Sequence, residues 1–254
     1  MRTFGSLLVR GLIVGLFAGL LAGTFAYVMG EPRVDAAIAI EEAGAAHTHD
    51  HDNNHGDSAE PAAEEKPLVS REGQKAGLFL ATSLYGVALG GMFAVGFTLL
   101  RRKLRTGNDA YAALGLAAAG FVGIVLVPFL KYPPNPPAVG NPDTITRRTV
   151  TYLLTLVIGL LAVWAGVAAS RWAARYGDLA RLGGGLLAFL VTIVAAYLIL
   201  PRINEVPETF PATLLWQFRF ASLGTQATLW LLLGFGYAAT VDDRRLVRPK
   251  VVAA

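Results

Sequence analysis

The chain has 254 residues, of which 54% are hydrophobic and only 16% are charged. A soluble globular domain carries about 25% charged residues, so the composition indicates a membrane protein. The absence of cysteine excludes disulfides and thiolate metal sites, and we interpret the formal net charge of +4 as a topology signal before a sign of nucleic-acid binding.

Six apolar segments approach the length of about 20 residues that a helix needs to cross the hydrocarbon core. They are residues 7–29, 78–100, 111–130, 149–170, 182–200 and 222–240. Each should be helical, because a strand would leave backbone groups unpaired in lipid. The sequence therefore predicts an all-α integral membrane protein with a single polytopic domain over residues 1–254. The last segment is the weakest, since Arg219 lies just before it, and five spans are the alternative.

A strip of glycines spaced four residues apart marks the first segment. It consists of Gly11, Gly15, Gly19 and Gly23, and Gly86 and Gly90 repeat the spacing in the second segment. Small residues at this spacing let another helix backbone approach closely in a membrane. We therefore expect the strip to pack helices in a bundle, with a pore-lining role as the alternative.

The segment between the first two spans, residues 31–70, has a different composition. It holds ten acidic and two basic residues, a formal charge of −8, together with every histidine of the chain. We predict a metal-binding tract made of His47, His49, Asp50, His51, Asp52 and His55. Imidazole is a good ligand for cobalt, nickel, copper and zinc. Because such a tract cannot build a core, residues 31–70 should be a mostly disordered loop, and a solvated linker without metal is the alternative.

Basic residues set the expected orientation. Thirteen of the 22 lie near the N-terminus, after the second span, after the fourth span and after the last span. Cytoplasmic loops of membrane proteins are enriched in Lys and Arg. The distribution predicts cytoplasmic N- and C-termini and an even number of spans, which places the histidine tract outside.

A threefold repeat is one interpretation of the helix ends. Each odd-numbered span ends near a proline, and each even-numbered span is preceded by an arginine. These residues are Pro32, Pro128 and Pro201, and Arg71, Arg148 and Arg219. The pattern suggests three helical hairpins of the same orientation around one axis; coincidence is the alternative, because both residue types are common at helix ends.

Candidate ion-facing groups gather at the outer ends of the predicted helices. This possible outer-mouth ion site consists of Met29, Glu31, Asn135, Asn204, Glu205 and Glu208. The six segments contain no Asp, Glu or His, which argues against a proton relay at mid-membrane. The chain has no phosphate-binding glycine loop and no Ser/His/Asp arrangement outside the tract. We predict no enzyme activity, no catalytic residue and no tightly bound cofactor.

The sequence resembles the CbtA family, predicted cobalt transporter subunits of bacteria. The resemblance lies in the glycine-rich residues 10–23, in Gly30-Glu31-Pro32, in the His/Asp-rich loop, in residues 71–78 and in the proline-rich residues 131–137. It implies a multi-pass protein of the cytoplasmic (inner) membrane that acts in cobalt uptake beside CbtB, a small single-span protein. The family is usually described with five spans, whereas charge and hydropathy here favour six.

We therefore predict a membrane subunit of a cobalt uptake system, in which the outer His/Asp loop captures Co²⁺ and a helical bundle provides the path. Ni²⁺ or Zn²⁺ are alternative ions. The competing hypotheses are a metal-sensing or metal-buffering membrane protein without transport, and an exporter of nickel, zinc or cobalt. The expected partners are the lipid bilayer and a CbtB-like subunit, and no nucleic acid.

Overall fold

The structure is a computed structural model that describes residues 3–49, 69–101, 108–137 and 139–242, with the backbone alone for residues 44–49. Within these residues the elements are helical and none is a strand, which confirms the all-α fold. In chain order they are α1 (Phe4–Phe25), the π-helical η1 (Ala26–Gly30), α2 (Glu31–His49), α3 (Arg71–Leu100), α4 (Asp109–Gly120), the π-helical η2 (Phe121–Leu126), α5 (Val127–Lys131), η3 (Pro142–Thr144), α6 (Ile145–Ala173), η4 (Ala174–Tyr176), α7 (Asp178–Ile199) and α8 (Ala212–Val241).

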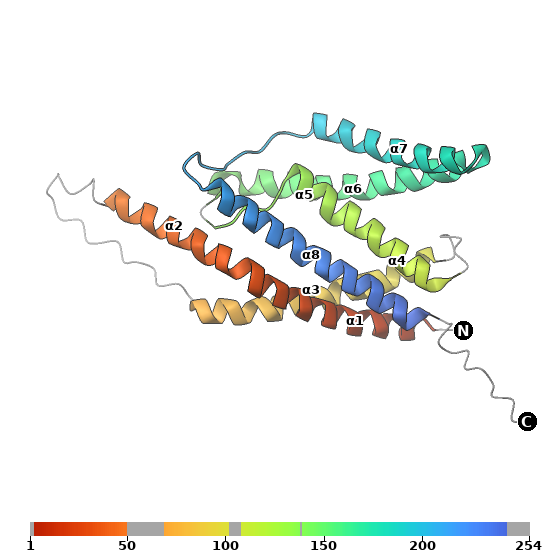
Figure 1. Cartoon of the computed structure of the whole chain (residues 1–254), viewed down its shortest axis with the longest axis horizontal. Helices are drawn as coiled ribbons and strands as arrows, with labels where there is room; N and C mark the ends of the chain where they lie inside the picture. The colour runs from red at the N-terminus through yellow and green to blue at the C-terminus, as the bar shows by residue number, and fades with distance from the viewer. Residues whose placement is uncertain (1–2, 50–68, 102–107, 138, 243–254) are drawn as a thin grey trace, which may run out of the picture.

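The long helices lie side by side and run alternately in opposite directions along the molecule (Figure 1). We name its two ends by their contents. The Arg10 end holds the start of α1 and the end of α8, where Arg10 Nη1 donates a hydrogen bond of 2.5 Å to the Thr240 carbonyl oxygen. The Pro-loop end holds the connections at residues 132–144 and 200–211.

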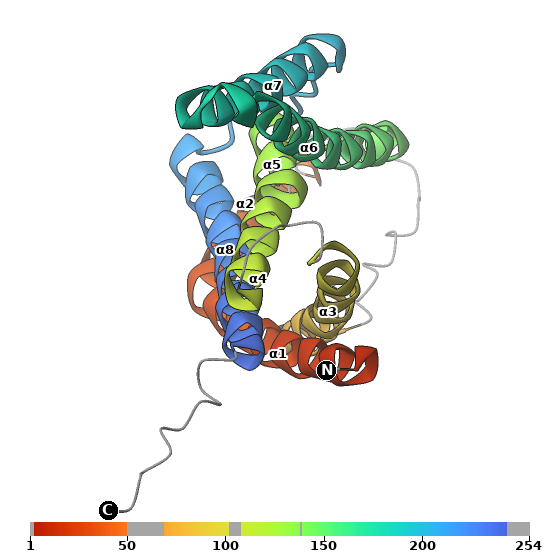
Figure 2. The ribbon, with the colours of Figure 1, turned by 90° about the vertical axis from the view of Figure 1, so that its right-hand side faces the viewer.

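Five stretches of the described chain are long and apolar enough to cross a membrane: Phe4–Ala43, Arg71–Leu100, Asp109–Lys131, Pro142–Tyr176 and Asp178–Ile199. The 30-residue α8 is long enough but more polar, because Arg219 and Gln226 interrupt its apolar sequence. It nevertheless packs along both α1 and α4 (Figure 2). The prediction of a sixth span at residues 222–240 rests on the length of α8 and on its packing along α1 and α4.

The glycine strip packs α1 directly against α3, as expected. A Cβ added to Gly15 would collide with the Gly86 carbonyl oxygen, and a Cβ added to Gly86 would collide with that of Gly15. The two helices therefore touch backbone to backbone, which only glycine allows. The strip lies between two helices and has a structural role.

The main core lies at the Arg10 end, where α1, α3, α4 and α8 meet. Tyr237 of α8 is fully buried at its centre, and its ring makes edge-on contacts with Phe93 and Phe97 at centroid distances of 5.2 Å. The Tyr237 hydroxyl lies 3.3 Å from the Leu7 carbonyl oxygen, to which it donates a hydrogen bond. This buried polar tip thus has a partner, as buried hydroxyls generally require.

Residues 31–49 are helical, so the prediction of a mostly disordered loop was wrong for this part of the segment 31–70. The helix of α1 continues through η1 into α2, which extends past the bundle at the Pro-loop end (Figure 1). Pro32 lacks an N–H and its ring clashes with the carbonyl four residues earlier in a regular α-helix; the wider π-helical turn directly before it avoids that clash. Ala37 is fully buried against Val139, Phe210 and Leu215, so this part of the segment does contribute to a core.

The hairpin expectation holds for helix direction but not for every pairing. The second hairpin packs through η2 and α5 on α6, where Gly123 and Gly159 meet backbone to backbone. The helices of the third hairpin have other neighbours: α8 packs on α1 and α4, and α7 packs on α6 at the edge of the bundle (Figure 2). None of the side chains of α7 is buried in the described structure.

Candidate functional site: a cavity at the Pro-loop end

A cavity of about 720 Å³ lies at the Pro-loop end, between α3, α5, α6 and α8 and the two long connections. Its polar lining consists of Tyr85, Tyr132, Asn135, Arg148, Tyr152, Asn204, Glu205, Arg219, Ser222 and Gln226. Apolar residues of η2, α5 and the loops complete the wall. Both the volume of the cavity and its mixture of polar and apolar side chains are typical of sites that bind a small molecule or a metal complex.

The proline-rich connection forms one wall because it cannot continue the helix of α5. Prolines fix the backbone and remove N–H donors, so α5 ends at Lys131. The Lys131 ammonium donates to the carbonyl oxygens of Tyr197 and Leu200, at 2.9 and 3.2 Å, and the Tyr132 hydroxyl donates to that of Pro201 at 2.7 Å. Burial raises the pKa of the Tyr132 hydroxyl. These bonds fasten α5 to the end of α7.

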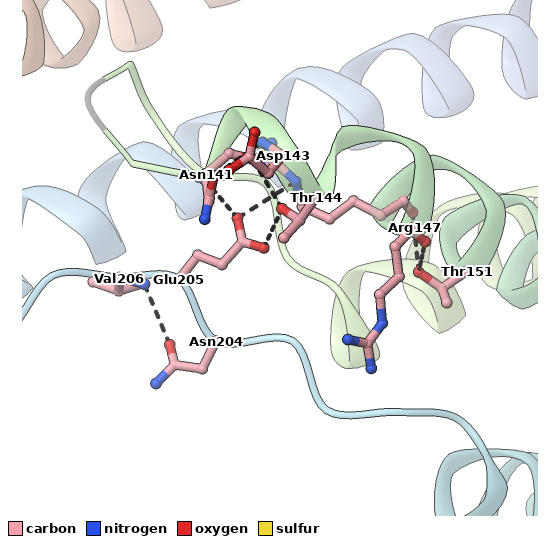
Figure 3. A network of polar contacts seen from close by, with 9 residues as sticks. Asn141, Asp143, Thr144, Arg147, Thr151, Asn204, Glu205 and Val206 are labelled. Atoms are coloured by element: carbon pink, nitrogen blue, oxygen red, sulfur yellow. Dashed lines mark hydrogen bonds and ion pairs between the residues drawn. The ribbon is translucent and has the colours of Figure 1, made fainter.

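Glu205 joins the second connection to the start of α6 (Figure 3). Its carboxylate accepts hydrogen bonds from Thr144 Oγ1 at 2.5 Å and from the Asn141 backbone N–H at 2.8 Å. Arg148 Nε lies 3.4 Å from the same carboxylate. The Thr144 hydroxyl, the Asn141 N–H and the charges of Arg148 and Arg147 lower the pKa of Glu205. Both carboxylate oxygens are therefore engaged by the protein.

Arg219 of α8 is half-buried in the cavity wall and is held by neutral groups. Its Nη2 donates to Asn135 Oδ1 at 2.9 Å and its Nε to the Pro134 carbonyl oxygen at 3.4 Å. Its guanidinium lies over the Trp216 ring, 5.4 Å from the centroid. Among the described residues no carboxylate lies within ion-pair distance of Arg219, so its charge is uncompensated there.

The lining is therefore cationic, with Arg148 and Arg219 against the single carboxylate of Glu205. Two polar atoms in it are buried and have no hydrogen-bond partner among the described residues: Arg148 Nε and the amide oxygen of Gln226. Buried polar groups of native proteins are generally paired with protein or solvent. Because Arg148 Nε faces the Glu205 carboxylate at 3.4 Å, the Gln226 oxygen is the buried acceptor that the cavity leaves open to an occupant.

The predicted outer-mouth residues divide into two groups. Asn135, Asn204 and Glu205 come together in the cavity wall. Glu31 lies elsewhere and pairs with Arg71 at 2.5 Å. Met29, on η1, is 42% exposed, and Glu208 is exposed in the connection before α8. The structure gathers half of the predicted set around one space.

The three arginines of the repeat pattern have two different environments. Arg71 pairs with both Glu31 and Asp35 of α2, so it ties α2 to α3. Arg148 and Arg219 line the cavity. From the sequence, Arg148 and Arg219 were placed at helix ends and were not named, and nor were Tyr132 and Tyr152, as candidate site residues. Their signal was a charged residue at the rim of an apolar span.

The histidine tract falls mostly outside the described residues. His47 and His49 stand on the last turn of α2, whose backbone alone is described there; Asp50, His51, Asp52 and His55 lie outside the described residues. Among the described residues no group of three or more His, Asp or Glu is placed to hold a metal ion.

The model of one protein family, described as "probable cobalt transporter subunit (CbtA)", matches residues 4–242. The chain belongs to the CbtA family. The match covers the eight α-helices of the described residues, so the cavity is built from residues that the CbtA match includes. No curated protein and no solved structure matches the chain. Its role as a subunit of a cobalt transporter rests on the CbtA match.

Proposed function

We propose that this CbtA-family chain is the membrane subunit of a cobalt uptake system, and that the cavity at the Pro-loop end is where cobalt enters its helical bundle. The observation that carries the proposal is the meeting of Asn135, Asn204 and Glu205 around one large polar cavity, in a chain of a cobalt transporter family. These residues come from segments about 70 positions apart, which only the folded bundle brings together.

The orientation follows from charge. In the sequence, 13 of the 22 basic residues lie in the four short segments at the N-terminus, after the second span, after the fourth span and after the last span, which are the segments assigned to the Arg10 end. Because Lys and Arg are enriched in cytoplasmic segments, we place this end in the cytoplasm and the Pro-loop end outside. α2 and the histidine tract then lie on the same side as the cavity mouth, in the bacterial cytoplasmic membrane.

The tract of residues 47–55 is proposed to concentrate the metal. Its imidazoles ligate Co²⁺, with Ni²⁺ and Zn²⁺ as the other candidates, and its acids attract cations over a longer range. A tract confined to one outer connection raises the local concentration of the ion but does not form the path. A second, single-span subunit of the CbtB type is the proposed partner.

The test is uptake of radioactive ⁵⁷Co²⁺ into proteoliposomes that contain the chain, with and without the partner subunit. We expect accumulation that saturates with cobalt concentration and is absent from empty vesicles. Deleting residues 44–58 should reduce uptake at low external cobalt and spare it at saturating cobalt, because capture and passage are separate. Binding without accumulation would support the metal-buffering alternative, and loss of preloaded cobalt from the vesicles would support an exporter.

A further inference from the structure

The charge of the cavity conflicts with direct entry of a bare cation. A hydrated Co²⁺ ion would face the guanidinium group of Arg219, whose charge no described carboxylate compensates, and like charges repel. The one carboxylate in the wall is already engaged: Glu205 accepts from Thr144 and Asn141 at 2.5 and 2.8 Å. The described lining therefore offers cobalt no free anionic ligand.

The same lining is suited to an oxyanion. A guanidinium has five N–H donors in a planar fork that matches carboxylate geometry. Arg219 uses one N–H on Asn135 and one on Pro134, so donors remain for a ligand in the cavity. The stacking of Trp216 at 5.4 Å and the bond from Arg219 to Asn135 also hold the fork in place before any ligand arrives.

Size and unpaired groups favour a ligand larger than one ion. Six waters around a metal fill about 180 Å³ at about 30 Å³ each, and the cavity holds about 720 Å³. A molecule that brings a hydroxyl or water donor to the buried Gln226 amide oxygen would satisfy that atom. Hydroxylated polycarboxylates carry such a donor together with acceptors for Arg219.

We propose that the cavity binds a small polycarboxylate, which gives one carboxylate to Arg219 and presents the others as oxygen ligands to Co²⁺. This inference rests on the proposed cobalt function and names the chemical form in which the metal is held. The anion binds first, through Arg219, and converts a cationic wall into one that accepts a cation. Cobalt gathered by the acidic tract is then held between the anion and solvent, without a protein carboxylate.

The test uses citrate as the probe and the full chain in detergent, with His47, His49, His51 and His55 replaced by Ala to remove metal binding by the tract. ⁵⁷Co²⁺ and ¹⁴C-citrate are followed by equilibrium dialysis. Citrate chelates cobalt in solution, so for an ordinary metal site it lowers the cobalt retained by the protein. We expect the reverse: equimolar citrate raises retained cobalt, and citrate binds without cobalt.

Three variants locate the effect. Arg219→Gln should weaken citrate binding by about tenfold or more, the loss expected for a charge-assisted hydrogen-bonded pair, and abolish the rise in retained cobalt. Asn135→Asp should do the same with the fold retained, because the new carboxylate occupies Arg219 in place of the ligand. Arg181→Gln is the control: Arg181 is exposed near the start of α7 at the Arg10 end, outside the cavity lining, and its replacement should leave both measurements unchanged.

Lower cobalt retention with citrate, or an undiminished rise in the Arg219→Gln and Asn135→Asp variants, would overturn the inference. Equal support of cobalt binding by inorganic phosphate or by phosphatidylglycerol would overturn the polycarboxylate assignment and identify a phosphate site.

Proteoliposome uptake separates this inference from the proposed function. Citrate-independent uptake that Arg219→Gln leaves intact would reject the inference and keep the transporter; citrate-dependent binding without any uptake would reject transport alone.

Discussion

Glu205 was predicted as an ion ligand from the sequence, but in the structure its carboxylate connects two segments of the chain. It stands among polar loop residues at the predicted outer face, and that position suggested ion contact. In the folded chain its carboxylate connects residues of the second connection to Thr144 and Arg148 at the start of α6. The charge of Glu205 therefore stabilises the cavity wall through these hydrogen bonds and this ion pair.

Replacing Glu205 with Gln should therefore lower the thermal unfolding midpoint of the purified protein. Because the folded pKa of Glu205 is lowered, its ionisation stabilises the fold above the ordinary carboxyl pKa of about 4.3. That contribution is lost as the pH falls through the lowered folded pKa. The difference between wild type and Glu205→Gln should thus be constant from about pH 6 to 8 and shrink in stronger acid.

Glu208→Gln is the matched control for this measurement, since Glu208 is exposed three residues further along the same connection. It should leave the unfolding midpoint unchanged. Equal unfolding midpoints of Glu205→Gln and Glu208→Gln at pH 7 would show that the Glu205 carboxylate does not stabilise the connection to α6.

The histidines make a second prediction at the scale of single residues. Calorimetry on a peptide of residues 44–58 should show heat of binding for Co²⁺ or Ni²⁺ at neutral pH. The heat should disappear below about pH 5.5, where imidazoles are protonated and no longer ligate. A peptide with the four histidines replaced by Ala is the control, and heat equal to that control would refute the metal tract.

At the scale of elements, the contact between α1 and α3 depends on glycine. Gly15→Ala places a Cβ against the backbone of Gly86 and Gly90, which cannot move without separating the helices. Overpacking of this kind costs about 1–3 kcal/mol. Unfolding in mixed micelles of mild detergent and dodecyl sulfate measures it. Gly77→Ala is the control, because a Cβ there meets open space; an equal effect of both variants would contradict the packing role.

The sequence predicted the helices better than their ends. Long apolar runs fix where a chain crosses a membrane, and those segments are helical as expected. The extension of α1 into α2 was missed because Pro32 and the acids after it are typical of a helix end. Two features that composition does not reveal stabilise it: the π-helical turn before Pro32 and the pairing of Arg71 with Glu31.

The cavity was only partly predictable for a different reason. Asn135, Asn204 and Glu205 are polar residues in outer connections, and this alone identified them. Their meeting with Arg148 and Arg219 depends on which helices pack together, which periodicity in one segment does not encode. The same polar-loop reasoning also selected Glu31, which instead pairs with Arg71 away from the cavity wall.

At the scale of the whole molecule, the number of spans is the main prediction. Reporter fusions at Asn108, Asp178 and the C-terminus should report the cytoplasm, and a fusion at Val139 should report the outside. The reason is that α8 returns to the Arg10 end, where Arg10 binds the Thr240 carbonyl oxygen. A fusion at Asp57 tests the tract and should also report the outside. A C-terminus found outside would leave five spans.

The edge position of α7 has a consequence for how the molecule is surrounded. Leu179, Leu198 and Ile199 are each more than four-fifths exposed, and the helix has a protein neighbour mainly on the side of α6. On the rest of its circumference, α7 is therefore expected to face the hydrocarbon of the bilayer. Extraction into detergent therefore replaces the larger part of what α7 touches, whereas the glycine face of α1 keeps its contact with α3.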